Sequence, residues 1–403
     1  MKEDRDPSFE DYIVPAQSCD FDLALIALRK IRLLLLCSTS ADDAIKAGIV
    51  PVLVKCLKSS MASIQEEAAW TIVNIVGGTE EQTKAVVRVG AIPLLINLLK
   101  SNDSKVRDHC VWALANIVGT GTYYRDFCIQ SGIIQPLLRL AASETNLLML
   151  QNIAWVFCNI CRQTDFPISN GNVCVMVPAL KRMLDYDNEG INKYILQSFY
   201  GLAYGENNHI QILLDNHIFE AIVGFLNNTD PIIYTNTFEI FNIMAYDGDE
   251  HLQHILDCGV LQQMRKLLVV ETNLDTVKRS VTFFISNVAA GSFTQIQKLF
   301  DENLISLIVG LFNDSNNTEL HGHILYTVMN LTCNGTEEQI SLLIDLNFIP
   351  SLATNRRKEV CELIMESRGD DKIKELANHS NPQIKQLSEN LLASYLFFKD
   401  DTN

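Results

Sequence analysis

A repeat of about 42 residues constrains the fold of this 403-residue chain more than any other feature. Gly48-Ile-Val-Pro-Val-Leu, Gly90-Ala-Ile-Pro-Leu-Leu and Gly132-Ile-Ile-Gln-Pro-Leu-Leu resemble one another, and successive glycines are 42 residues apart. Equivalent starts follow later in the chain, at Cys174, Asn216, Gly259, Asn303 and Asn347. Such a period is typical of repeat proteins, in which each unit buries its apolar faces against its neighbours. We therefore expect one array of about eight or nine units instead of two or three separate domains.

Each repeat has the pattern of helices alone. In the second repeat, the spacing of apolar residues predicts a helix over Ile92–Leu99, a polar break over Lys100–Ser104 and a long helix over Val106–Val118. We expect Gly119 to end that helix in a left-handed conformation, and Ser or Asp in the break to cap the next helix. A helical unit of this length is in the range of armadillo and HEAT repeats. The predicted fold is therefore all-α, a solenoid of stacked repeats with a long groove.

Charge and cysteine usage limit the partners and the compartment. The chain has 48 Asp and Glu against 32 Lys and Arg, a formal net charge of −16. An acidic surface disfavours nucleic acid and favours basic partners. The 11 cysteines are scattered, and neither a secretory signal nor an apolar run long enough for a membrane span is visible. We therefore expect reduced thiols, no membrane association, and a location in the cytoplasm and nucleus.

A tryptophan and an asparagine one helical turn apart recur in phase with the repeat. Residues i and i+4 share one face of a helix. An Asn can donate to and accept from the backbone of an extended peptide, and neighbouring indoles can hold the stems of Lys or Arg, with about 0.5–2 kcal/mol of cation–π attraction for each cation. The pairs are Trp70 with Asn74, Trp112 with Asn116, and Trp155 with Asn159.

A purely structural role for the asparagine stays open. The same asparagine recurs without tryptophan at Asn242, Asn287 and Asn330, where it could bond between neighbouring helices. A lone Trp on a helix is also more often part of the core than part of a site. Three consecutive pairs in phase with the repeat nevertheless favour a peptide-binding surface.

These motifs resemble the importin-α family of nuclear-import adaptors. Segments such as Glu67-Ala-Ala-Trp-Thr-Ile-Val-Asn-Ile-Val-Gly-Gly-Thr79 and His109-Cys-Val-Trp-Ala-Leu-Ala-Asn-Ile-Val-Gly119 are similar to successive armadillo repeats of that family, and the similarity covers about residues 20–397. The resemblance implies an all-α fold, a right-handed superhelical armadillo-repeat solenoid, whose groove holds lysine-rich nuclear localisation signals. Its implied major site comprises the three Trp/Asn pairs together with Gly78, Thr83 and Asn152.

The major site departs from the family at one position. Thr120 stands where the family has an aspartate that pairs with the key lysine. Losing a hydrogen bond to a charged group costs about 1.5–3 kcal/mol. Asp108, one turn before Trp112, or Glu66, before Trp70, could supply a carboxylate instead.

The minor site implied by the resemblance is degenerate. Its two tryptophans are replaced by Phe283 and Tyr326, and Ser280 and His323 stand at its acidic positions. Asn287 and Asn330 remain, whereas Gln197 and Gly201 occupy the ladder positions of the intervening repeat. We expect weak minor-site binding and poor use of bipartite signals.

Both ends also depart from the family pattern. Residues 1–18 are acidic and are expected to be a disordered tail, without the basic segment that binds importin-β in the family. The predicted solenoid covers residues 19–397, with one unit apparently missing near 351–360, and residues 398–403 form a second tail. Engagement of importin-β and of the export receptor is therefore doubtful.

No pattern indicates an enzyme, a cofactor or a metal. Cys158 and Cys161 lie within a ladder helix without a second pair, and His251, His254 and Cys258 lack a fourth ligand. The predicted function is an importin-α-like adaptor for proteins with basic nuclear localisation signals. The alternatives are a diverged armadillo scaffold and a cargo competitor that is not coupled to importin-β.

Overall fold

The structure is a computed structural model, and it confirms an all-helical fold. It describes residues 8–339, except 38–39, 163–166, 206, 247, 270–274, 315–316 and 337, together with isolated positions from 342 to 389. No strand occurs among these residues. The chain forms two compact units, Met1–Asn216 and His217–Asn403.

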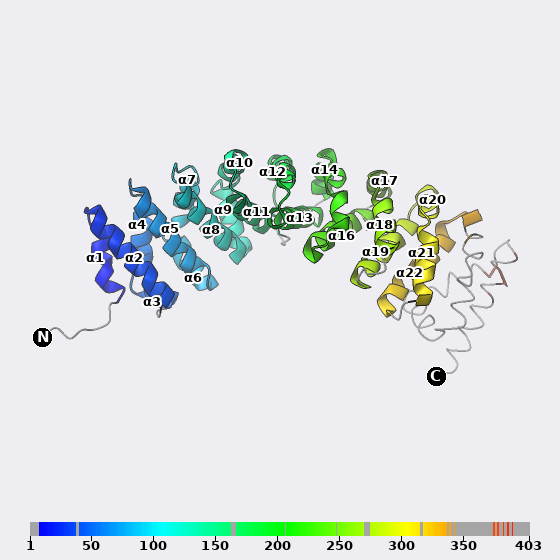
Figure 1. The fold of residues 1–403 in the computed structure, drawn as a ribbon, viewed down its shortest axis with the longest axis horizontal. Helices are drawn as coiled ribbons and strands as arrows, with labels where there is room; N and C mark the ends of the chain where they lie inside the picture. Colours follow the sequence, from blue (N-terminus) through cyan, green and yellow to red (C-terminus); the bar gives the residue numbers. More distant parts are fainter. Residues whose placement is uncertain are drawn as a thin grey trace, which may run out of the picture. The chain divides into compact units, whose positions relative to one another are not determined.

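The first unit is a stack of three-helix repeats (Figure 1). Its long ladder helices pack one against the next in chain order. They are α2 (Phe21–Cys37), α5 (Ala62–Val76), α8 (Ser104–Thr120), α11 (Leu147–Cys161) and α13 (Glu189–Ala203). The helices that begin the repeats are α4 (Ile49–Cys56), α7 (Ala91–Leu98), α10 (Ile134–Ser143) and α12 (Asn170–Met183), and the last of these is followed by η1 (Leu184–Tyr186). The shorter helices are α1 (Glu10–Ala16), α3 (Ala41–Lys46), α6 (Glu80–Arg88), α9 (Thr122–Gln130) and α14 (Asn207–Asp215).

The second unit repeats the same plan. Its ladder helices are α16 (Pro231–Tyr246), α19 (Asp275–Ala289) and α22 (Thr318–Asn334), and α19 packs against both of the others. The remaining elements are α15 (Ile218–Ile222), η2 (Val223–Asn227), α17 (Asp249–Asp257), α18 (Val260–Val269), α20 (Phe293–Asp301) and α21 (Leu304–Asp314). The predicted repeats beyond residue 339, including the missing unit near 351–360 and the tail 398–403, lie outside the described residues.

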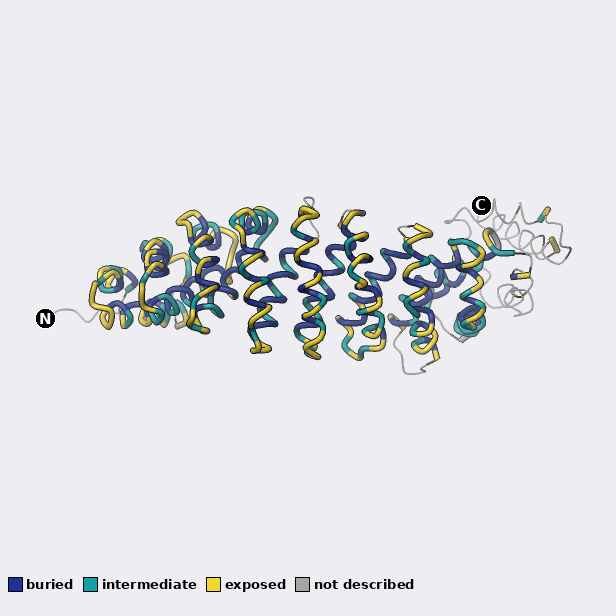
Figure 2. The backbone as a smooth tube through the Cα atoms, turned by 90° about the horizontal axis from the view of Figure 1, so that it is seen from above, coloured by how far each residue is buried: buried dark blue, intermediate teal, exposed yellow. Residues whose placement is uncertain are grey.

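The cores lie between successive helices. Figure 2 shows buried positions along the middle of each unit and exposed positions at the outer turns. Every ladder helix contributes apolar residues at 3–4 spacing to these cores, and in α8 Val111, Leu114 and Val118 are completely buried. This is the packing that a chain with a 42-residue period requires, because no single repeat has a core of its own.

Left-handed residues stand at the starts of the repeats. Gly48, Gly90 and Gly132 have φ between 81° and 87° and join the short helix to the helix that follows it. Gly259, Asn303 and His217 have the same conformation in the second unit. The predicted left-handed cap at Gly119 is wrong, because α8 continues to Thr120. The predicted start at Cys174 lies inside α12, and the left-handed residue expected near Asn216 is His217.

The expected cap in the polar break is confirmed. The Asp103 carboxylate accepts hydrogen bonds from the backbone N–H groups of Lys105 and Val106 and so begins α8. Asn146 caps α11 in the same way through Leu148 and Met149. These caps fix where the ladder helices start and therefore which turn carries each tryptophan.

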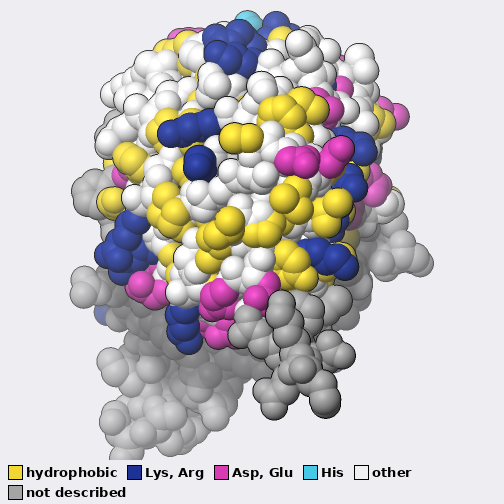
Figure 3. Space-filling view, turned by 90° about the vertical axis from the view of Figure 1, so that its left-hand side faces the viewer, with side chains coloured by type: hydrophobic (Ala, Val, Ile, Leu, Met, Phe, Trp, Pro, Cys, Tyr) yellow, Lys and Arg dark blue, Asp and Glu magenta, His cyan; other side chains and the backbone are white. Residues whose placement is uncertain are grey.

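The predicted disordered tail is wrong for residues 10–16. These residues form α1, which packs against α2 and α4 and buries Phe9 and Ala16. Residues 1–7 lie outside the described part. Figure 3 looks onto this end of the first unit and shows apolar side chains interspersed with charged ones. Exposed apolar residues on α1 and α2 include Val14, Phe21, Leu23, Ile26 and Leu33.

Candidate peptide-binding surface

The three Trp/Asn pairs lie on three consecutive ladder helices, α5, α8 and α11. We call these residues the ladder: Trp70 and Asn74, Trp112 and Asn116, Trp155 and Asn159. Contacts between equivalent turns hold the helices in register. Asn152 Nδ2 of α11 donates to Asp108 Oδ1 of α8 at 3.2 Å, and Asn159 Nδ2 donates to Ala115 O at 3.1 Å. The equivalent positions of the repeats are thus side by side.

The ladder asparagines have a structural role as well. Asn159 uses Nδ2 to bridge to α8, and Asn330 in the second unit bridges to Ser286 O of α19 at 2.9 Å. Asn74 Nδ2 and Asn287 Nδ2 are buried without a partner among the described residues. For Asn159 the carboxamide oxygen is then the atom that can accept a peptide N–H, whereas one donor is already in use.

The three tryptophans differ in their surroundings. Trp112 is 43% exposed, and no ring or cation of the described residues stacks on it. Trp70 has Arg32 Cζ of α2 at 3.7 Å from its ring centroid and the His109 ring of α8 at 4.9 Å, nearly parallel at 17°. Trp155 is flanked by Tyr194 of α13 with ring centroids 6.4 Å apart. Of the three indoles, Trp112 is the one that has no ring or cation of the described residues packed against it.

The pocket expected for the key lysine contains hydroxyls and no aspartate. Thr83 Oγ1 lies 3.2 Å from Thr120 Oγ1, and the Thr120 hydroxyl donates to Asn116 O at 2.9 Å. Thr83 is completely buried, whereas Gly78 is exposed. The oxygens that these contacts bring together, two hydroxyls and Asn116 O, are neutral and are weaker partners for a lysine than a carboxylate.

The two carboxylates considered as substitutes lie elsewhere. Asp108 and Thr120 are twelve residues apart on α8, which is about 18 Å at 1.5 Å per residue. Asp108 is instead hydrogen-bonded to Asn152, and Glu66 lies 3.8 Å from Lys105 Nζ. Neither carboxylate replaces the aspartate near Thr120, but Asp108 lies one turn before Trp112.

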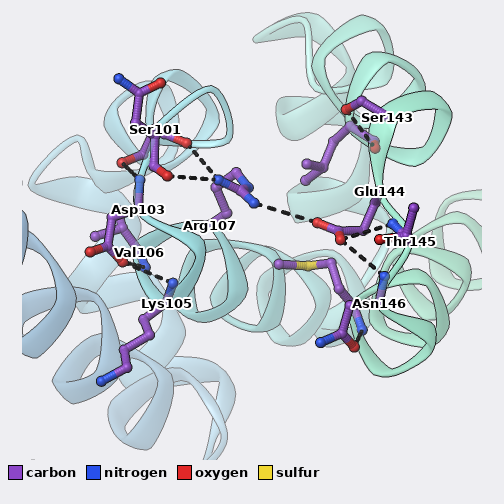
Figure 4. Close-up of polar contacts among 12 residues, drawn as sticks. Ser101, Asp103, Lys105, Val106, Arg107, Ser143, Glu144, Thr145 and Asn146 are labelled. Atoms are coloured by element: carbon purple, nitrogen blue, oxygen red, sulfur yellow. Dashed lines mark hydrogen bonds and ion pairs between the residues drawn. The ribbon is translucent and has the colours of Figure 1, made fainter.

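An ion pair between repeats sets the spacing of α8 and α11. Figure 4 shows Arg107 between the loop before α8 and the loop before α11. Arg107 Nη1 donates to Ser101 O at 2.9 Å, and Nη2 lies 3.5 Å from Glu144 Oε2. Glu144 Oε1 accepts from the backbone N–H groups of Thr145 and Asn146, each at 3.0 Å.

This geometry affects the charge state of Glu144. Its pKa is held below the ordinary value, first by the Asn146 N–H and then by the Thr145 N–H and Arg107, against the opposing effect of burial. The ionised carboxylate therefore joins the two loops. We infer that it helps to position Trp112 relative to Trp155, since each of these helices begins at one of the loops.

The ladder does not continue into α13. Gly201 stands at the asparagine position, and a Cβ there would lie 2.2 Å from Cys161 O, so only glycine allows this close approach of α13 to α11. Gln197 accepts a hydrogen bond from Cys158 Sγ at 3.3 Å. Neither residue therefore continues the row of side chains formed by the ladder.

The predicted minor site brings its four residues together in the second unit. Phe283 and Tyr326 are exposed on α19 and α22, and Asn287 and Asn330 lie one turn after them. His323 packs on Phe283 with ring centroids 5.1 Å apart. Arg279 forms an ion pair with Glu319. The pKa of His323 is lowered first by burial and second by the charge of Arg279. A cation therefore lies beside the place where a basic side chain would enter.

Nothing in the described part of the chain gathers metal ligands. No group of three or more His, Cys, Asp or Glu residues is placed to hold an ion among the residues searched. Cys158 is engaged with Gln197, and burial raises the pKa of the Cys158 thiol to about 11. No described helix has the length and apolar character that crossing a bilayer requires.

Sequence reasoning missed the rings that pack against Trp70, Trp155 and Phe283. His109 stacks on Trp70, whereas Tyr194 and His323 lie tilted against Trp155 and Phe283. Each follows its partner by 39 or 40 residues, just under one repeat. A search for rings at that offset would have found all three, whereas Arg32 has no comparable signal.

Comparisons with known proteins agree with this geometry. A family model of the armadillo/beta-catenin-like repeat matches residues 40–77, 79–119 and 122–162. The crystal structure of an engineered protein aligns with a TM-score of 0.75 and 22% identity over 97% of this chain and 99% of that one, which shows the fold alone. The chain is therefore an armadillo-repeat protein.

The chain is also similar to curated proteins that are named importin subunit alpha. Importin subunit alpha-3 of Caenorhabditis elegans is 44% identical over 216 residues, which are 52% of this chain and 41% of the relative. Importin subunit alpha-1a of Oryza sativa subsp. japonica is 28% identical over 295 residues, which are 72% and 56% of the two chains. Importin subunit alpha-8 of Arabidopsis thaliana is 27% identical over 362 residues, 89% and 77%. The chain is thus similar to importin-α subunits over much of its length, and it spans about half the length of the first two of these relatives.

Proposed function

We propose that the first unit binds an extended basic peptide along the ladder and that the protein acts as an adaptor for cargo with lysine-rich nuclear localisation signals. The importin-α family is a family of nuclear-import adaptors, and the names of the relatives support the same role for this chain. Such an adaptor would work in the cytoplasm and the nucleus. The proposal includes neither catalysis nor a cofactor.

One observation carries the proposal. The exposed Trp112 indole lies between two pairs in the same register, with Asp108 one turn away and with Asn152 joining α8 to α11. A lysine stem can lie on the indole while its ammonium group meets the carboxylate, and ladder carboxamides can hold the peptide backbone.

A binding measurement with matched variants tests the proposal. Isothermal titration of a lysine-rich import-signal peptide should give at least tenfold weaker binding to Trp112→Ala/Asn116→Ala than to the unmodified protein. Phe283→Ala/Asn287→Ala is the control, because it removes the same kind of pair from the predicted minor site and should change the affinity by less than threefold. Equal affinity of all three proteins would refute a ladder-bound peptide.

A second candidate function is competition for cargo. Thr120 and its neutral surroundings indicate divergence from the family's lysine site, and a diverged protein that binds cargo without productive coupling would withhold it from import. Whether importin-β or the export receptor binds is part of the same question. Adding the protein to a nuclear import assay separates the two functions: an adaptor stimulates import when importin-β is supplied, and a competitor inhibits it.

A further inference from the structure

The Trp70 indole is covered on both faces by the protein itself. Arg32 comes from α2 and His109 from α8, the helices that pack on opposite sides of α5. Arg32 Cζ lies 3.7 Å and the His109 ring 4.9 Å from the centroid of the indole. These distances leave no space for another side chain between the indole and either residue. The slot between Trp70 and Trp112 is therefore filled by the His109 ring.

Arg32 is held in place by an ion pair. Its Nε lies 2.7 Å from Glu67 Oε2, and Arg29 Nε lies 3.1 Å from Glu67 Oε1. Glu67 is buried and the Arg32 side chain is only 14% exposed, so this pair is shielded from solvent. Glu66, one turn before Trp70, lies 3.8 Å from Lys105 Nζ. Glu67 and Glu66 each have a cation of this chain within ion-pair distance.

The slot between Trp112 and Trp155 is not filled in this way. Asn152 occupies, in α11, the position that His109 occupies in α8, three residues before the tryptophan. Its amide donates to Asp108 and does not stack on Trp112. Trp112 therefore keeps an exposed face beside a carboxylate that has no cationic partner within ion-pair distance in the described structure.

We propose that His109 and Arg32 close the first slot of the ladder, so that the groove selects peptides by a single basic side chain seated between Trp112 and Trp155. The occupant is an extended peptide with one Lys or Arg at that register and without a requirement for a second basic residue on the Trp70 side. This inference rests on the proposed function and makes it more specific. His109 is then a specificity-determining residue that acts by filling a slot.

A histidine at the equivalent position of the second unit also packs against an aromatic ring, but at a tilt of 58°. His323 precedes Tyr326 by three residues, as His109 precedes Trp112, and it packs on Phe283. Burial lowers the pKa of both histidines, so both rings are neutral at pH 7 and pack as apolar groups. For His109 the Lys105 backbone and the carboxylates of Asp108, Glu66 and Glu67 oppose that effect.

The three tryptophans of the chain allow a direct test, because each gives its own indole N–H signal in an NMR spectrum. Peptides of nine residues, built from Ala and Ser with one Lys or with two Lys separated by one or two residues, are titrated into the full-length protein. We expect the Trp112 signal to shift and the Trp70 signal to stay. The second Lys should improve the affinity less than twofold.

Two substitutions of the same residue provide matched variants. His109→Ala should open the slot, so that the Trp70 signal shifts and the second Lys improves the affinity about 2- to 30-fold, the range of one cation–π contact. His109→Phe keeps a ring on Trp70 and should behave like the unmodified protein. A Trp70 shift in the unmodified protein, or none in His109→Ala, would overturn the proposal.

A second readout separates this proposal from the proposed function. Acrylamide quenching of Trp70 fluorescence, measured in a Trp112→Phe/Trp155→Phe background, should increase when His109 is replaced by Ala and stay the same with Phe. If no basic peptide shifts any indole, both the proposed function and the selection of a single basic residue fail. If peptides bind but quenching is equal in all variants, only the closed slot is refuted.

Discussion

We expect Thr120 to limit how strongly the protein holds a basic side chain beside the Thr83 and Thr120 hydroxyls. Its hydroxyl donates to Asn116 O and can accept from Thr83 Oγ1, so the two threonines satisfy each other without a ligand. Asp108, on the same helix, is about 18 Å away. The pocket is therefore neutral and already hydrogen-bonded, which favours a weak partner there.

A single substitution should restore the missing charge. Thr120→Asp is expected to tighten the binding of a lysine-rich peptide about tenfold or more, because a hydrogen bond to a charged group contributes about 1.5–3 kcal/mol. Titration calorimetry measures the gain. Thr120→Asn is the control of equal size without charge and should give little change. If Asp and Asn give the same affinity, this pocket does not contact the peptide.

Alanine substitutions at two glycines compare the cost of a left-handed backbone with the cost of a steric clash. Gly90 has φ of 87° with open space around its α-carbon, whereas Gly201 has an ordinary φ but lies against the Cys161 carbonyl. We expect Gly90→Ala to lower the free energy of unfolding by about 1–2 kcal/mol, the cost of a left-handed L-residue. Gly201→Ala should cost more, because α13 must move away from α11.

Chemical denaturation of both variants measures this difference. Gly224→Ala provides the control, since Gly224 has neither a positive φ nor a close neighbour. A smaller loss for Gly201→Ala than for Gly90→Ala would mean that α13 does not need its present distance from α11.

The loop between α10 and α11 should make stability depend on pH. The folded pKa of Glu144 lies below the ordinary value of about 4.3, so its contribution is complete above that value and is lost as the pH falls through the folded pKa. Glu144→Gln should therefore be less stable than the unmodified protein at pH 7. The difference should disappear in acid.

Thermal unfolding of the two proteins from pH 7 down to pH 3 gives this comparison. Glu81→Gln is the control. The exposed Glu81 carboxylate on α6 forms an ion pair with Lys84, three residues later, and such a surface pair contributes little to stability. If the difference in stability between Glu144→Gln and the unmodified protein stays constant with pH, the shape of the Glu144 side chain, and not its charge, joins the two loops.

Capping boxes at the repeat period were not recognised in the sequence. Thr79 with Gln82, Ser292 with Gln295 and Thr336 with Gln339 share the Ser/Thr-x-x-Gln pattern. Each glutamine amide also donates to the preceding repeat, as Gln295 Nε2 does to Asp249 O at 2.8 Å. The Ser/Thr-x-x-Gln pattern is local and can be read from the sequence. It explains why these short helices begin where they do.

Period and helix geometry were enough to predict the all-helical repeats and the shared face of each Trp/Asn pair, because both depend on local spacing. The covering of Trp70 by Arg32 and His109 was not predicted, since it depends on how neighbouring repeats pack. The left-handed conformation was predicted at Gly119, but this residue lies in the last turn of α8, whereas Gly90, directly before α7, has it.

At the scale of the whole molecule, the acidity is unevenly distributed. The first unit has 19 Lys and Arg against 23 Asp and Glu, a net charge of −4, and the second has 13 against 25, a net charge of −12. Most of the −16 therefore belongs to the unit that lacks the ladder. The net charge does not by itself indicate an acidic peptide site; near the ladder, local carboxylates such as Asp108 matter more.

This distribution predicts how salt acts on peptide binding. Charges of the second unit influence an approaching peptide over long distances only when screening is weak, since the Debye length is about 30 Å at 0.01 M salt and about 8 Å at 0.15 M. Raising the salt over that range should slow the association of a lysine-rich peptide by about tenfold or more, and dissociation should change far less, because the contacts at Trp112 are local. Stopped-flow fluorescence gives both rates.

A peptide with glutamine in place of each lysine should show no salt dependence of association. If salt instead accelerates dissociation and leaves association unchanged, the peptide is held by exposed ion pairs, and the second unit's charge has no part in its capture.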